Sequence, residues 1–146
     1  MGYIEAIKDT KLVEIIEPGL LESTSFIFLC PNGLVYLNSY HIPMFSDRDF
    51  LTAIYTPPVP NEKTFMVISR PVIHADAPHR LHHTRGMYES IEFVRDLGDE
   101  GVEWIMATAS SPAGNIPIWI TERAIPGQVS ADVPAFLKWI EKKGWK

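Results

Sequence analysis

The C-terminal third of the sequence, residues 104–146, constrains the fold more than any other part. An alternating stretch leads into a tight turn at residues 112–115, and helix-forming sequence follows, with an expected interruption at Pro126-Gly127. In the second half of this helix five apolar residues recur at i, i+4, i+7, i+8 and i+11: Val129, Val133, Phe136, Leu137 and Ile140. The charged residues of the same segment, Asp132 among them, are assigned mostly to positions off this stripe. A helix with one apolar stripe lies against another element, and the strand-like sequence before it predicts that this element is a sheet.

Six segments of the preceding sequence have the alternation and the turn signals of β-strands. They are residues 25–30, 34–40, 47–58, 64–72, 84–97 and 102–110. Most of the connections are short enough for hairpins, which predicts an antiparallel sheet over residues 20–110 and a C-terminal helix over residues 114–143. Residues 1–19 are expected to hold a short helical segment that ends before Pro18-Gly19. The fold class is therefore α+β.

Composition limits the function classes. A chain of 146 residues without a long linker is expected to be a single domain, residues 1–146. Its net charge of -5 argues against nucleic acid as a partner, because phosphate binding is driven by Lys and Arg. Cys30 is the only cysteine, which favours a reducing, cytoplasmic location. No stretch has the roughly 20 apolar residues of a membrane span, so stable membrane insertion is not expected.

The sequence shows no motif of a metal, cofactor or triad enzyme. Four histidines lie within ten positions: His74, His79, His82 and His83. Adjacent strand residues point to opposite faces, and no HExxH motif or cysteine partner accompanies these histidines, so a solvated loop is preferred to a metal site. P-loop, dinucleotide and nucleophile-elbow motifs are also missing, so no cofactor is predicted.

Several ordered motifs resemble the START-like (steroidogenic-acute-regulatory-type lipid transfer) domains, in particular a fungal START-like family. The ordered pieces ATAS…GN-[LI]-P-x-W…PG…DV-x-x-FLKW of the family pattern fit residues 107–110, 114–117, 119, 126–127, 132–133 and 136–139. Upstream pieces also fit, at residues 48–50, 71–72, 74, 76–78, 85–86 and 88–90. The resemblance covers roughly residues 20–143.

This resemblance implies a helix-grip fold, in which a curved sheet of about six strands wraps a long, broken C-terminal helix. It also implies an apolar cavity between sheet and helix for a lipid, sterol, polyketide or terpenoid-like molecule. Relative to the family, the chain is expected to lack N-terminal strands. A shortened sheet leaves an exposed edge, which favours a homodimer.

Strand parity indicates which polar residues could act inside such a cavity. Tyr88, Ser90 and Glu92 share one face of their strand, and that face either lines the cavity or is outward and wet. Burial would raise the pKa of Glu92 and suit it to acid–base work. His41, near a strand end, is the histidine best placed to reach the cavity as a general base. His41, Glu92 and Tyr88 are thus the catalytic candidates, if the protein is an enzyme.

Candidate ligand-binding residues follow from the same parity argument and from the expected helix. They are Phe26, Phe28, Tyr36, Phe50, Met66, Tyr88, Trp104, Met106 and Trp119. Aromatic residues at such spacing are more often plain core, and that alternative stays open.

Three functions are consistent with the sequence. The first is a carrier or sensor that binds a hydrophobic small molecule without chemistry. The second is a cyclase or isomerase of fungal secondary metabolism that uses the same cavity with one or two acid–base groups. The third is an interaction protein whose cavity has collapsed. A buried ionisable residue with a perturbed pKa would favour the enzyme.

Overall fold

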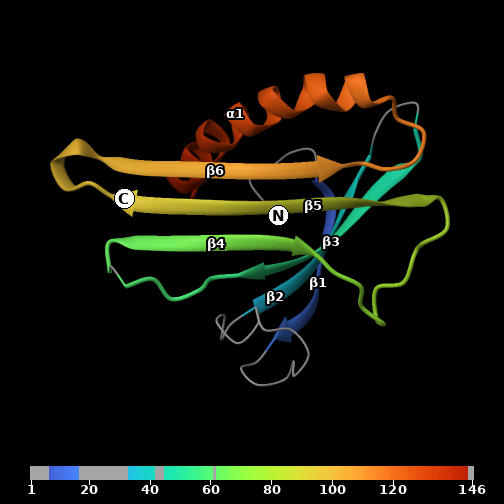
Figure 1. Ribbon diagram of the computed structural model, residues 1–146, viewed down its shortest axis with the longest axis horizontal. Coiled ribbons are helices and arrows are strands. Elements are labelled where there is room, and N and C mark those ends of the chain that lie inside the picture. Colours follow the sequence, from blue (N-terminus) through green and yellow to red (C-terminus); the bar gives the residue numbers. More distant parts are fainter. Residues whose placement is uncertain (1–6, 17–32, 42–44, 61, 145–146) are drawn as a thin grey trace.

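The computed structural model describes residues 7–16, 33–41, 45–60 and 62–144. The described chain forms one six-stranded sheet and one long helix (Figure 1). The elements are β1 Ile7–Ile16, β2 Gly33–Tyr40, β3 Asp47–Tyr55, β4 Thr64–Pro71, β5 His83–Asp96, the 3-10 turn η2 Gly98–Glu100, β6 Val102–Ser111 and α1 Ile118–Lys143.

The strands follow one another in the sheet in sequence order, and sequential neighbours are antiparallel. This arrangement confirms the predicted antiparallel sheet with a C-terminal helix. One further pairing is parallel: the start of β5 runs beside the start of β3, with Phe50 opposite Gly86. The sheet is curved, and α1 lies along its β6 side (Figure 1).

The prediction of a helical segment at the N-terminus is wrong for residues 7–16. These residues form β1, which pairs with β2 along its whole length. Thr10, Val13 and Ile15 are β-branched and favour extended backbone, and the hydrogen bonds of the ladder decide between two patterns that the apolar spacing left open. The strand expected at residues 25–30 lies outside the described residues.

The predicted interruption of the C-terminal helix is also wrong. α1 continues through Pro126 and Pro134, both of which lie within its bounds and are exposed. A proline inside a helix removes one N–H donor and favours a kink, but the helix can resume beyond it. α1 ends at Gly144, whose φ of 71° is left-handed and whose N–H donates to the carbonyl groups of Ile140 and Glu141.

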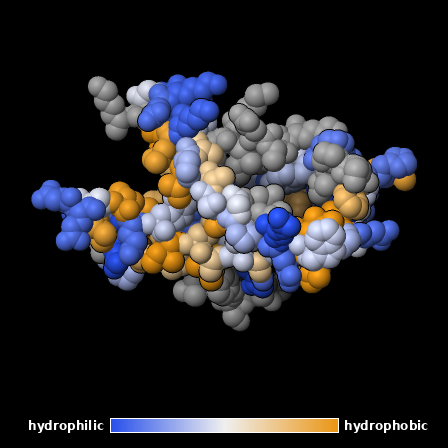
Figure 2. Space-filling model, turned by 90° about the horizontal axis from the view of Figure 1, so that it is seen from above, coloured by the Kyte–Doolittle hydropathy of each residue, from blue (hydrophilic) through white to orange (hydrophobic). Residues whose placement is uncertain are grey.

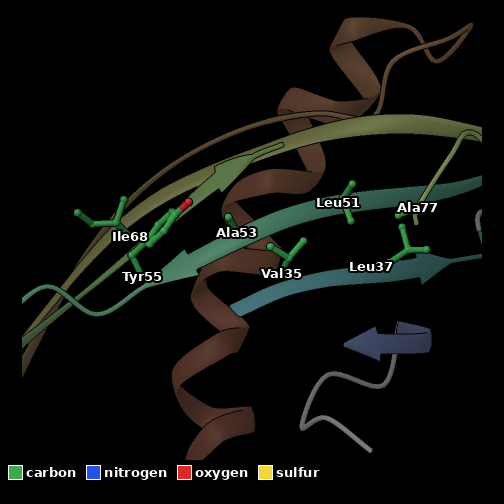
Figure 3. Close-up of a cluster of buried hydrophobic side chains, with 7 residues drawn as sticks. All are labelled: Val35, Leu37, Leu51, Ala53, Tyr55, Ile68 and Ala77. Carbon is green, nitrogen blue, oxygen red and sulfur yellow. The ribbon is translucent and has the colours of Figure 1, made fainter. Parts of the chain in front are cut away.

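The two faces of the sheet differ in what they bury. The helix-side face is the one that carries Trp104 and Met106 toward α1, and the strand registers place Tyr36, Phe50, Ser69, Tyr88 and Glu92 on it as well. The outer face carries the hydrophobic core (Figure 3). Its members are Val35, Leu37, Leu51, Ala53, Tyr55 and Ile68, together with Ala77 from the β4–β5 connection. Val13 and Met66 pack against this core.

A buried carboxylate ties the β4–β5 connection to the outer face. Asp49, which is 1% exposed, accepts hydrogen bonds from Arg85 Nε at 2.7 Å and from Arg80 Nε at 3.4 Å. Arg85 also donates to the carbonyl of Ala77 at 3.2 Å, and Arg80 donates to the Ser39 hydroxyl. Two arginines from the connection and from β5 thereby hold Ala77 over the core.

The neighbouring residue, Arg48, fixes the turn that leads into α1. It is 1% exposed and points to the opposite face from Asp49. Its Nε donates to the carbonyl of Pro112 at 3.0 Å and its Nη2 donates to that of Ala113 at 3.4 Å. Gly114, at a φ of 67°, has no room for a side chain without close contact to Arg48 and Thr84. Arg48 and Asp49 therefore act as structural anchors on opposite faces of the sheet.

Candidate functional site

A hollow of about 150 Å³ lies between β6 and α1. It is lined by Trp104 and Met106 of β6 and by Val129, Asp132 and Val133 of α1. The two strand residues alternate on one face, and the three helix residues are spaced i, i+3 and i+4, so each set points to the same side of its element. Figure 2, seen from the side of α1, shows hydrophobic residues exposed between polar ones on this part of the molecule. The lining is apolar except for one carboxylate.

Aromatic rings support the hollow where α1 meets β6. The rings of Trp104 and Phe136 meet edge to face, with centroids 5.7 Å apart, and Phe136 stacks on Trp139 at 6.1 Å. The Trp104 Nε1–H donates to Glu92 Oε2 at 3.1 Å, which fixes both the indole and the carboxyl group. The cross-strand partner of Glu92 is Met106, so Glu92 lies beside the hollow on the neighbouring strand.

Glu92 and Asp132 form a pair of carboxyl groups with raised pKa values. Burial is the largest cause of the raised pKa of Glu92; the hydrogen bond from Trp104 and that from Ser90 oppose it, and the nearby charge of Asp132 adds to it. Burial also raises the pKa of Asp132. Because like charges disfavour each other, the two groups resist being ionised together in this setting.

Asp132 has no hydrogen bond or ion pair within the described part of the chain, although it is half-buried. The basic residues described on α1, Arg123, Lys138, Lys142 and Lys143, are all exposed. Glu92 receives neutral donors only, from Trp104 and from the Ser90 hydroxyl at 3.5 Å. Among the described residues, the surroundings of the hollow therefore have two acids and no basic counterpart.

Three further residues that the sequence predicted share the helix-side face without lining the hollow. Tyr36, Phe50 and Tyr88 are half-buried on β2, β3 and β5. The Phe50 ring lies over Gly86, where an added Cβ would be 2.4 Å from its Cε1, and meets Tyr40 edge to face at 5.4 Å. These aromatic residues continue the helix-side face of the sheet beyond the hollow.

Other predicted residues lie elsewhere. Met66 is on the outer face, because its register partner is Phe93 and not Glu92. Trp119 is 63% exposed in the first turn of α1. His41 is exposed at the end of β2, where its Nδ1 lies 2.8 Å from Asp47 Oδ1. Phe26 and Phe28 are outside the described residues.

The histidine-rich connection makes structural contacts. His74 Nε2 lies 2.9 Å from Glu14 Oε2 and links the connection to β1, and His83 Nε2 lies 4.0 Å from Asp47 Oδ2. Within the described ranges, no group of three or more His, Cys, Asp or Glu residues could hold a metal ion. Nor does any helix in those ranges have both the length and the hydropathy needed to cross a membrane.

Asp132 lines the hollow but is not among the candidate residues predicted from the sequence. Assigned off the apolar stripe, it is three residues after Val129 and four before Phe136, which is the spacing of residues on one helix face. That spacing was the available signal. From the sequence alone, a charged residue at such a position is assigned to the border of the apolar stripe. Only the packing of the helix against the sheet shows that it faces the hollow.

The fold matches a solved structure, that of human STARD10, with a TM-score of 0.72 and 19% sequence identity. The match covers 97% of this chain and 54% of that chain, so the chain spans about half the length of the solved protein. The chain therefore has the START-like helix-grip fold, as expected. Residues 4–140 match a family described as "Protein of unknown function (DUF3074)", and the chain belongs to this family. No curated protein matches the sequence significantly.

Proposed function

We propose that the protein binds a hydrophobic small molecule between the helix-side face and α1. The observation that carries the proposal is the hollow itself, in which four apolar side chains surround one carboxylate. Concave, mostly apolar sites with a few placed polar groups are typical of small-molecule binding. The helix-grip fold supports the proposal, since it sets a helix against a curved sheet. A carrier or sensor working in the cytoplasm is the form of this function that we favour.

Exposure of the apolar stripe on α1 also supports the proposal. Leu137 is 53% exposed and Val133 is 43% exposed, although both belong to the stripe that the sequence predicts to be buried. A bound apolar molecule next to Val133 would remove part of this surface from water, which is favourable by about 25 cal/mol per Å².

A second candidate function is a cyclase or isomerase that acts in the same cavity. The observation that favours it is Glu92, a carboxyl group with a raised pKa beside an apolar hollow. Glu92 would exchange a proton with the bound molecule, and Tyr88 on the same strand face would orient it. His41 has no part in this version, because it is exposed at a strand end. If the protein is an enzyme, it should convert a bound polyketide or terpenoid, and the Glu92→Gln variant should lose this activity. A carrier would bind the molecule and leave it unchanged.

The binding test uses N-phenyl-1-naphthylamine, a neutral hydrophobic probe whose fluorescence rises in apolar surroundings. Met106→Trp places a larger side chain in the hollow, and we expect it to weaken probe binding by about tenfold, or about 1.4 kcal/mol. Ile105→Trp is the matched control, because Ile105 is the next residue on β6 and is 54% exposed on the outer face. Equal affinity in the two variants, with both folded by circular dichroism, would contradict the proposed site.

Native mass spectrometry of freshly purified protein adds an independent observation. We expect a co-purified hydrophobic molecule that is absent from Met106→Trp and present in Ile105→Trp. A protein that carries no molecule and binds no probe would support the collapsed-cavity alternative.

We also propose that the chain forms a homodimer through β6. In the described part of the sheet, no strand pairs with the edge of β6 that lies opposite β5. Residues 104–111 carry no charge that would protect such an edge from pairing. Size-exclusion chromatography with light scattering should show a dimer that Ala109→Lys disrupts. Ile91→Lys, on the same face of β5 and away from the edge, is the control. A monomer at all concentrations would contradict this part of the proposal.

A further inference from the structure

We infer that the ligand carries a hydrogen-bond-donating head, best an ammonium group, which lies between Asp132 of α1 and Glu92 of β5. This inference rests on the proposed function and specifies the class of molecule: an amphiphilic amine with an apolar body. It follows from the hollow, its lining and the unequal supply of donors and acceptors around it.

The donors that surround the carboxyl pair are already in use. Trp104 Nε1–H points at Glu92 Oε2, and the Ser90 hydroxyl points at Glu92 Oε1. Thr108, across from Ser90 on β6, donates its hydroxyl to the backbone carbonyl of Glu89. Ionised carboxylates only accept hydrogen bonds. What the pair offers to a bound molecule is therefore acceptor capacity and negative charge.

Charges on every element packed around the hollow agree with this reading. β4 contributes uncharged Val67 opposite Glu92, β6 contributes Trp104 and Met106, and α1 contributes Asp132 between Val129 and Val133. A carboxylate ligand would bring a further negative charge next to these two acids and would be rejected. An ammonium group would relieve the repulsion between Glu92 and Asp132 and would be held by charge-assisted hydrogen bonds.

The volume limits how much of the ligand is enclosed. A hollow of about 150 Å³ has the size of an apolar cavity that holds one benzene ring. The head and roughly the first six carbons would fill it by this comparison. A longer body would continue along the helix-side face toward the exposed side of Val133 and Leu137.

The test compares three probes with one alkyl chain and different heads: octylamine, octanol and octanoate. Isothermal titration calorimetry at neutral pH measures the affinity of each for the whole chain. We expect octylamine to bind about tenfold or more tightly than octanoate, with octanol between them, because the negative head of octanoate is repelled by the acidic groups.

Variants separate the site from general attraction to an acidic protein. Glu92→Gln and Asp132→Asn should each weaken octylamine binding by about tenfold and bring octanoate closer to octanol. Glu89→Gln changes the net charge equally but lies exposed on the outer face of the same strand, and it should leave the order of the probes unchanged. Octanoate binding as tightly as octylamine would overturn the inference while leaving the cavity proposal intact. No binding of any probe, octanol included, would overturn the proposed function as well.

Discussion

The two faces of this sheet have the same strands and opposite physical character. On the outer face six buried apolar side chains, from Val35 to Ile68, form a continuous core, with the buried polar residues Asp49 and Ser39 beside them. On the helix-side face the buried uncharged side chains are hydroxyls, at Thr52, Ser69 and Ser90, and the large apolar residues are half-buried or exposed. The outer face carries the hydrophobic core, whereas the helix-side face is polar, acidic and partly exposed to solvent.

Under the proposed function, the difference between the two faces separates stability from binding. Burial and the Asp49 ion pairs on the outer face hold the sheet together, whereas the helix-side face keeps a hollow, an exposed stripe on α1 and two carboxyl groups with raised pKa values. Substitutions on the outer face should therefore change stability, and those on the helix-side face should change binding.

The largest effect on stability is expected at Asp49. Removing its carboxylate in Asp49→Ala leaves Arg85 and Arg80 without their shared partner, and breaking a buried pair in this way costs about 3–5 kcal/mol. Urea unfolding followed by circular dichroism measures the loss. Asp132→Asn on the other face is the comparison and should not destabilise the protein. A loss at Asp132 as large as that at Asp49 would remove the distinction between the faces.

The core residue Leu51 should give the next largest effect. It is 2% exposed, and Leu51→Ala should lower the free energy of unfolding by about 2–5 kcal/mol through lost burial and the cavity that remains. Met106→Ala on the half-buried helix-side face should cost no more than about 1.5 kcal/mol, because less of its area leaves water on folding. Urea unfolding measures the stability of both variants. Equal losses of stability would contradict the proposed difference between the outer face and the helix-side face.

A smaller effect is expected at Gly86. An alanine Cβ would meet the Phe50 ring at 2.4 Å, so Gly86→Ala should cost about 1–3 kcal/mol by overpacking. Phe50→Leu combined with Gly86→Ala should recover part of that loss, since the smaller side chain leaves room. A double-mutant cycle measured by thermal unfolding would show the coupling, and strictly additive losses would argue against this contact.

The smallest expected effect is a pH dependence from Glu92 and Asp132. Both pKa values are raised in the folded state above the ordinary values of 4.5 and 3.8, so the folded protein binds more protons than the unfolded chain in that region. Stability contributed by these groups is complete at acidic pH and is lost as pH rises through the raised pKa values. The double variant Glu92→Gln, Asp132→Asn should therefore gain stability relative to the parent between acidic and neutral pH. A stability difference between the double variant and the parent that stays constant across that pH range would contradict the expected pH dependence.

The sequence predicted those parts of the fold that local patterns determine. Alternation located β2 to β6, and the i, i+4, i+7 spacing located α1 and the need for a sheet beneath it. β1 was not recoverable, because the spacing of Ile7, Leu12 and Ile15 fits a helix as well as a strand and the pairing with β2 decides. The continuity of α1 across Pro126 depends on packing that a local breaker signal does not contain.

Site residues followed the same rule. That Trp104 and Met106 share a face follows from parity within one strand, whereas the face of Met66 depends on the register between strands. Asp132 was missed because its charge outweighed its position on the helix, although Val129 and Phe136 flank it at i−3 and i+4. The sequence of a single strand does not determine which face of the sheet packs against α1, because that depends on how the whole sheet is assembled.

The most direct test of the account is a titration of ¹⁵N-labelled protein with octylamine, followed by two-dimensional NMR. If a ligand binds between the two elements, the indole N–H signal of Trp104 and the amides of Met106, Val129 and Val133 should shift together and saturate. Amides of the outer core, such as Leu51 and Ala53, should not move. Shifts confined to the outer face, or scattered over the acidic surface without saturation, would contradict the claim that the helix-side face is the binding face.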